Sequence, residues 1–199
     1  IPKQAVLGAY NADFGDGLYM IEEHVSDGHD DLESFGRAKK IESTYDMINK
    51  LREDEEYVVD KETYVRARLF DILVGDWDRH VDQWRWAEIK TEDGKKLFKP
   101  IPRDRDQVFS RWGDGLIMNF GSRSVPSLRI FEGFHEKIRS VKGFTSSPRT
   151  FALDMALLAE TDLDQWLEQA RLIQKSIDEE VIDRAFMAFP EEVRDETRS

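Results

Sequence analysis

The chain has 199 residues, of which 40% are hydrophobic and 35% charged, the balance of an ordinary globular protein. Its net charge of −12 repels a phosphate backbone on average, so we expect no nucleic-acid partner. The absence of cysteine excludes disulfides and cysteine-ligated zinc, and no apolar run approaches the ~20 residues of a membrane-spanning helix, so we expect no membrane contact.

The first expected element is a strand at Leu18–His24, where hydrophobic and polar residues partly alternate. The polar, glycine-containing stretch Val25–Lys40 is expected to be a loop. A helix is expected over residues 43–54, because Ser43 or Thr44 can cap it and apolar residues then recur at helical spacing.

The strongest helix signal lies between Asp60 and Gly75. Asp60 is a favoured N-cap residue, and Gly75 suits the left-handed conformation that commonly follows the last helical residue. Four apolar residues form the expected buried face, namely Val65, Leu69, Ile72 and Leu73.

A β-hairpin is expected next, over residues 83–102. Trp84 and Trp86 alternate with Arg85, which is the period of a strand with one buried face. Residues 91–94, Thr-Glu-Asp-Gly, supply the turn before the return strand. We expect the two tryptophans to be core residues.

Residues 110–147 are rich in glycine and serine and are expected to be irregular, with a helix as an option at 131–140. Three helices are expected at 149–160, 162–176 and 178–189, the later two capped by Asp162 and Asp178 and the last closed by Pro190. The expected fold is mainly α with a short β-hairpin, an α+β class. It forms a single domain over 1–199, with C-terminal helices at 148–190.

Acidic residues gather at the two ends of the hairpin. One loop carries Asp76, Asp78 and Asp82, and the other carries Asp104 and Asp106. Because a hairpin brings its ends together, the two loops should lie side by side. Clustered carboxylates repel one another, and a bound Mg²⁺ or Mn²⁺ is the usual relief.

A plainer interpretation stands beside this one, since a single aspartate after a helix is most often a cap or a solvated turn residue. The placement of Asp78 and Asp104 at both ends of one hairpin favours the metal site. If their stretch is extended, Asp104 and Asp106 can face one side and share the ion. No histidine spacing predicts a zinc site.

The order of acidic loop, short hairpin and second acidic loop resembles the catalytic half of the protein-kinase fold. Residues 75–83, "GDWDRHVDQ", and residues 104–109, "DRDQVF", are similar to motifs of atypical kinase-like families. These are the HipA toxins, the secretory-pathway casein kinases of the Golgi and the spore-coat CotH kinases. Residues 67–86 and 99–115 resemble, more narrowly, a kinase-like region within large surface-associated bacterial proteins that also carry metallophosphoesterase and outer-membrane barrel modules. This closer resemblance covers roughly Leu18 to Asp114.

The resemblance implies a role for each matching residue. Asp78 takes the catalytic position, His80 and Arg79 support the loop, and Gln83 and Asp104, with Asp106 as a further candidate, hold the metal. The implied cofactors are ATP and Mg²⁺ or Mn²⁺, and the implied substrate carries a hydroxyl group. The chemical core is expected at residues 60–109, and we set no expectation for the oligomeric state.

Within the same resemblance, residues 1–24 contain the hinge-like segment, and Glu22 and Glu23 would meet the nucleotide. The sequence has no glycine-rich nucleotide loop and no Walker motif, so the kinase N-lobe is expected to be largely absent. Since the chain begins at Ile1, we expect a piece of a longer protein that is inactive alone. The resemblance implies a periplasmic or outer-membrane-associated location, with the cytoplasm as the alternative.

Two other functions stay open. A pseudokinase or interaction module would keep the fold without the chemistry, and Gln83 favours this because asparagine or an acid is usual at that position of the motif. A metal-dependent phosphoesterase is the third hypothesis, because residues 75–80 also resemble a phosphatase motif. It has less support, because such two-metal sites need Asp-x-His and Gly-Asn-His motifs with further histidines, while this chain has four scattered histidines and no Gly-Asn-His.

Overall fold

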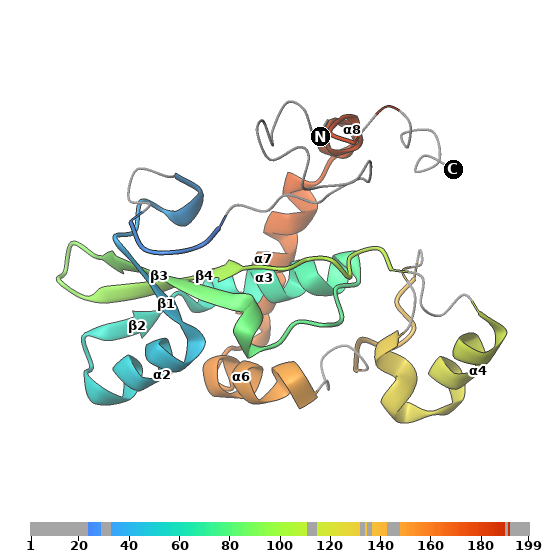
Figure 1. The fold of residues 1–199 in the computed structure, drawn as a ribbon, viewed down its shortest axis with the longest axis horizontal. Helices are drawn as coiled ribbons and strands as arrows, with labels where there is room; N and C mark the ends of the chain where they lie inside the picture. The colour runs from blue at the N-terminus through green and yellow to red at the C-terminus, as the bar shows by residue number, and fades with distance from the viewer. Residues whose placement is uncertain are drawn as a thin grey trace, which may run out of the picture. The chain divides into compact units, whose positions relative to one another are not determined.

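The computed structural model describes residues 24–28, 33–110, 115–131, 134, 137–142, 148–189 and 191 (Figure 1). Among these, residues 25–173 belong to one compact unit, while His24 and the residues from Gln174 onward belong to a second. The expected strand at Leu18–His24 lies outside the described residues except for His24, and so does Pro190. The expected core at 60–109 lies wholly within the first unit.

The fold is α+β, as predicted. Strands alternate with helices in the first half, in the order β1 Lys40–Ser43, α2 Thr44–Glu53, β2 Tyr57–Val59, α3 Lys61–Val74, β3 Trp84–Lys90 and β4 Lys96–Pro102. Helices fill the second half, namely α4 Leu116–Ser124, α6 Pro148–Leu158, α7 Leu163–Ser176 and α8 Glu179–Met187. The described residues also form the short 3₁₀ helices η2 Glu33–Phe35, η3 Val81–Gln83 and η4 Pro126–Phe131.

The predicted hairpin is present as the antiparallel pair β3 and β4, but it is not alone. It forms the centre of a four-stranded mixed sheet in the order β1-β3-β4-β2, in which β1 joins β3 antiparallel and β2 joins β4 parallel. The prediction missed β1 and β2 because strands this short show too little alternation. Each also runs directly into the cap of the next helix.

The capping residues set the ends of the helices as predicted. The Ser43 side chain accepts a hydrogen bond from the Asp46 amide (3.1 Å), and Asp60 accepts one from the Thr63 amide (2.9 Å). Gly75 follows α3 in the left-handed conformation, with φ of 72°.

The sheet and helices enclose a core built around the two hairpin tryptophans. Trp84 and Trp86 are fully buried, as predicted, and Tyr64 of α3 stacks at 5.7 Å from the Trp86 ring. Helix α2 packs against β1, β2 and β3, and α3 runs along β4 (Figure 1). The core cluster comprises Met47, Tyr64, Val65, Trp84, Trp86, Phe98, Leu153, Leu157 and Leu158.

The second half differs in part from its prediction. Within 110–147, expected to be irregular, α4 and η4 are helical and pack against each other, while the described residues at 137–140 are not helical. The helices α6, α7 and α8 match the three predicted ones, and Asp162 and Asp178 accept the capping hydrogen bonds. Among the described residues, no helix has the length and apolarity needed to cross a membrane.

A lysine on α2 joins two neighbouring strands. Its Nζ atom donates to Glu42 of β1 and to Glu88 of β3 (2.8 Å). Burial alone would lower the pKa of Lys50, but the hydrogen bonds and charges of these two carboxylates raise it above its ordinary value. Lys50 therefore separates two acids that would otherwise repel each other across the sheet.

Replacing Lys50 with methionine should lower the free energy of unfolding by about 1–2 kcal/mol, because two partly buried carboxylates lose their shared cation. Urea denaturation of the variant measures this loss. Lys99→Met, at an exposed position on β4, is the matched control. Equal losses in the two variants would show that the bridge contributes nothing.

Candidate functional site

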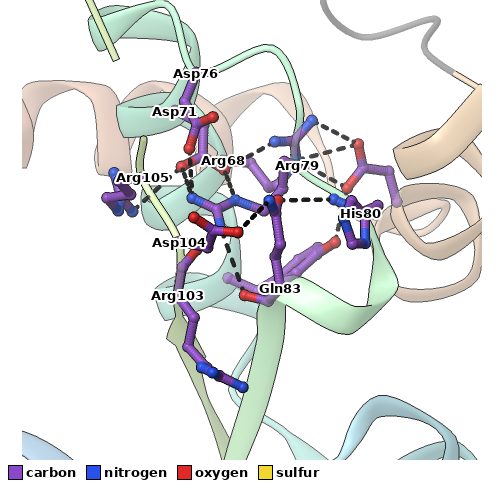
Figure 2. A network of polar contacts seen from close by, with 11 residues as sticks. Arg68, Asp71, Asp76, Arg79, His80, Gln83, Arg103, Asp104 and Arg105 are labelled. Atoms are coloured by element: carbon purple, nitrogen blue, oxygen red, sulfur yellow. Dashed lines mark hydrogen bonds and ion pairs between the residues drawn. The ribbon is translucent and has the colours of Figure 1, made fainter. Parts of the chain in front are cut away.

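The two acidic loops meet at the open end of the hairpin, as predicted. The backbone amide of Arg103 donates to the Gln83 carbonyl (2.9 Å), which continues the β3–β4 ladder beyond the strands. The Gln83 Nε2 atom donates to Asp104 Oδ2 (3.3 Å), so a side chain of the first loop touches a carboxylate of the second (Figure 2).

Arg79 lies buried beneath this junction, and all the N–H groups of its guanidinium donate hydrogen bonds. Its Nε and Nη2 atoms donate to the two oxygens of Asp71 (3.0 and 3.1 Å), and Nη2 also donates to Asp76 (2.6 Å). Its Nη1 atom donates to the backbone carbonyls of Gln83 and Arg103. Each of the five N–H groups of the guanidinium therefore has an acceptor, and one side chain fastens both loops to α3.

Arg79 belongs to a larger cluster of charges that the sequence analysis did not foresee. Asp71 of α3, fully buried, also contacts Arg68 (2.9 Å) and Arg105 (3.2 Å), and Arg68 reaches Asp154 of α6 (3.0 Å). The cluster balances three arginines with three aspartates, comprising Arg68, Asp71, Asp76, Arg79, Arg105 and Asp154 (Figure 2).

A signal for this cluster was present in the sequence. Tyr64, Arg68 and Asp71 recur at helical spacing on the face of α3 that carries the buried Val65. Opposite charges three residues apart on a buried face indicate an internal ion pair, because an isolated buried charge is strongly disfavoured.

Burial disfavours the charged form of Asp76. Burial raises its pKa to about 6, the negative charge of Asp71 adds to this effect, and the positive charges of Arg79 and Arg105 oppose it. Its Oδ1 atom is buried and has no hydrogen-bond partner in the described part of the chain. Asp76 is therefore a structural acid of the buried cluster.

Asp78, the predicted catalytic residue, points elsewhere. It is half-buried, and its Oδ1 atom forms an ion pair with Arg149 at the start of α6. The contact joins residues 71 positions apart in the chain. Asp78 therefore faces a cation contributed by the second half of the chain, while its neighbour Asp76 is buried on Arg79.

His80, which the resemblance placed at the catalytic loop, makes its hydrogen bonds within that loop. Its Nδ1 atom accepts a hydrogen bond from the Asp82 amide (3.3 Å), and its own amide donates to Gln83 Oε1 (3.3 Å). These reciprocal bonds cap η3, the single turn that leads from the loop into β3. His80 thereby fixes which atoms of Gln83 face Asp104.

The predicted metal ligands fit a cation only in part. Gln83 commits its oxygen to His80 and presents its N–H to Asp104, so in this arrangement it orients that carboxylate and offers no oxygen to a metal. Asp104 is exposed, and Mg²⁺ commonly uses one or two carboxylates together with water and substrate phosphates. Asp104 therefore supplies one exposed carboxylate of the kind that such a site uses.

The expected sharing of an ion between Asp104 and Asp106 needs an extended stretch, and the stretch is not extended. Asp104 has φ of 53°, and residues 106–109 form a turn. Asp106 accepts a hydrogen bond from the Gln107 side chain (3.0 Å). Within the described ranges, no group of three or more His, Asp or Glu side chains is arranged to hold a metal.

The predicted nucleotide-binding residues Glu22 and Glu23 lie outside the described residues. Comparison with protein-family models, with curated proteins and with solved structures finds no match for this chain.

Proposed function

We propose that the two acidic loops form the phosphate-binding end of a kinase-like phosphotransfer lobe for a hydroxyl-bearing substrate. The observation that carries the proposal is the Gln83–Asp104 contact above the buried Arg79, which holds two acidic loops in fixed register. Phosphoryl transfer depends mainly on positioning and on charge neutralisation, and such a junction supplies the first.

In this proposal each residue has a stated task. Asp78 accepts or orients the proton of the substrate hydroxyl, and Asp104 holds Mg²⁺ or Mn²⁺, which when bound neutralises charge on the phosphates of ATP. Gln83 sets the orientation of Asp104. Because Arg149 occupies Oδ1 of Asp78, a substrate hydroxyl reaches that oxygen only if the arginine shares it or moves.

A pseudokinase or interaction module is the second candidate, and two observations favour it. Gln83 presents an N–H group where the family motif places a metal-binding oxygen, and Asp78 is paired with Arg149. Under this alternative the lobe binds the nucleotide without transferring phosphate.

The test of the proposal is calorimetric titration of ATP into the 199-residue chain in the presence of Mn²⁺. We expect binding that Asp104→Asn weakens about tenfold or more, because the substitution removes the carboxylate ligand of the cation. Asp164→Asn removes an exposed acid from the first turn of α7 and should leave affinity unchanged. Absence of binding, or binding indifferent to Asp104→Asn, would refute the proposal.

Transfer itself is measured with radiolabelled ATP. The chain alone should give no useful labelling, since its sequence holds no glycine-rich loop to grip the phosphates. A longer protein with upstream sequence should label in a manner that Asp78→Asn abolishes. Nucleotide binding without labelling in that longer protein would establish the pseudokinase instead.

A further inference from the structure

Two arginines share one face of the hairpin beside Asp104. Arg85 on β3 pairs with Ile101 on β4, and Arg103 lies two residues beyond Ile101, where its amide continues the ladder by donating to the Gln83 carbonyl. Residues two apart on a strand point to the same face, so Arg85 and Arg103 are diagonal neighbours across the two strands. This face is opposite the one that buries Trp84 and Trp86.

Neither guanidinium has a carboxylate partner among the described residues. The Nη1 atom of Arg85 donates to the backbone carbonyls of Asp82 (3.0 Å) and Trp84 (2.8 Å). The Nε atom of Arg103 is buried without a hydrogen-bond partner in the described part of the chain, although the side chain as a whole is half-exposed. Figure 2 shows Arg103 directed away from Asp71 and Asp76.

The two positive charges act on each other. Burial and the charge of Arg103 lower the pKa of Arg85, and the charge of Asp82 opposes this effect. Two neighbouring positive charges repel each other, and an anion bound between them reduces this repulsion. Among the described residues, no aspartate or glutamate forms an ion pair with either arginine.

We propose that Arg85 and Arg103 form an anion subsite that binds the phosphate groups of the ligand. The inference rests on the proposed function for the identity of that ligand, a nucleoside triphosphate whose phosphates would lie between the cation at Asp104 and the two guanidiniums. Arginine suits this role because its planar N–H groups bind phosphate oxygens in pairs. The pair supplies the positive charge that phosphate binding requires.

The experiment titrates the 199-residue chain with sodium tripolyphosphate and, separately, with ATP, both with Mn²⁺ present. Arg85→Gln and Arg103→Gln should each weaken binding of both ligands about tenfold or more. Arg85→Lys and Arg103→Lys keep the charge and should lose less. Arg52→Gln removes an exposed arginine of α2 and should change affinity less than about twofold.

Thermal unfolding of every variant shows whether it remains folded, and the lysine variants cover the case in which a glutamine variant does not. Arginine-dependent binding of tripolyphosphate without binding of ATP would support the subsite and refute the nucleotide function. Binding of ATP that depends on Asp104 but not on either arginine would overturn the subsite and leave the proposed function standing. No binding of either anion, or equal effects of Arg103→Gln and Arg52→Gln, would also overturn it.

Discussion

Replacing Arg79 with methionine should lower the free energy of unfolding by about 3–5 kcal/mol, the range measured when one partner of a buried ion pair is removed. The substitution leaves the buried Asp76 without its ion-pair partner, and Asp71 keeps only Arg68 and Arg105. It also removes the donor to two backbone carbonyls in the acidic loops. A loss this large is a substantial part of the whole stability of a small domain.

Chemical denaturation monitored by tryptophan fluorescence measures the loss. Arg79→Lys keeps the charge but offers fewer donors without the planar fork, so its loss should be intermediate. Arg52→Met, on the exposed face of α2, is the control for removing an arginine as such and should cost less than about 0.5 kcal/mol. A loss at Arg79 no greater than at Arg52 would contradict the role assigned to the cluster.

Stability should also depend on pH through Asp76. Its pKa is raised by burial to about 6 from an ordinary 3.8, so between these values the folded protein binds more protons than the unfolded chain. The resulting penalty is fully present above about pH 6 and is relieved as the pH falls toward 4. Three charged groups face this carboxyl group: Asp71 raises its pKa further, while Arg79 and Arg105 lower it.

Asp76→Asn removes that titration. The pH dependence contributed by the other carboxylates is common to the variant and the parent, so it cancels when the two are compared. The free energy of unfolding of the variant minus that of the parent should fall by about 2 kcal/mol when the pH is lowered from 7.5 to 4.5. The reason is that only the parent gains stability as Asp76 takes up a proton. Urea denaturation of both proteins at the two pH values gives the difference. An equal effect of the substitution at both values would mean that burial does not raise the pKa of Asp76.

Local signals made much of the fold predictable. Asp60 and Gly75 set the ends of α3 through their own backbone and side-chain chemistry, and the Thr91–Gly94 turn set the hairpin. Strands β1 and β2 were missed because their pairing is determined by neighbours distant in sequence. A segment of three or four residues contains too little pattern to reveal such pairing.

Part of the candidate site was also predictable from the sequence. Hairpin connectivity predicted that the two acidic loops lie side by side, and the contact between Gln83 and Asp104 shows that they do. The Asp78–Arg149 pair was beyond reach, because no local pattern joins residues so far apart in the chain. The orientation of the Gln83 amide was likewise unpredictable, since it depends on a hydrogen bond from the backbone of His80.

The way in which Arg79 binds the backbone has a consequence for motion. Its Nη1 atom holds carbonyls of both acidic loops, so neither loop can open without breaking contacts to the other. Hydrogen exchange should therefore show the amides of Gln83 and Arg103 opening together, with one shared free energy, as a single cooperative unit. Loops that carry binding residues usually open independently and at low cost. Here the buried side chain of Arg79 should make the backbone amides of both loops exchange as slowly as those of the sheet from which the loops extend.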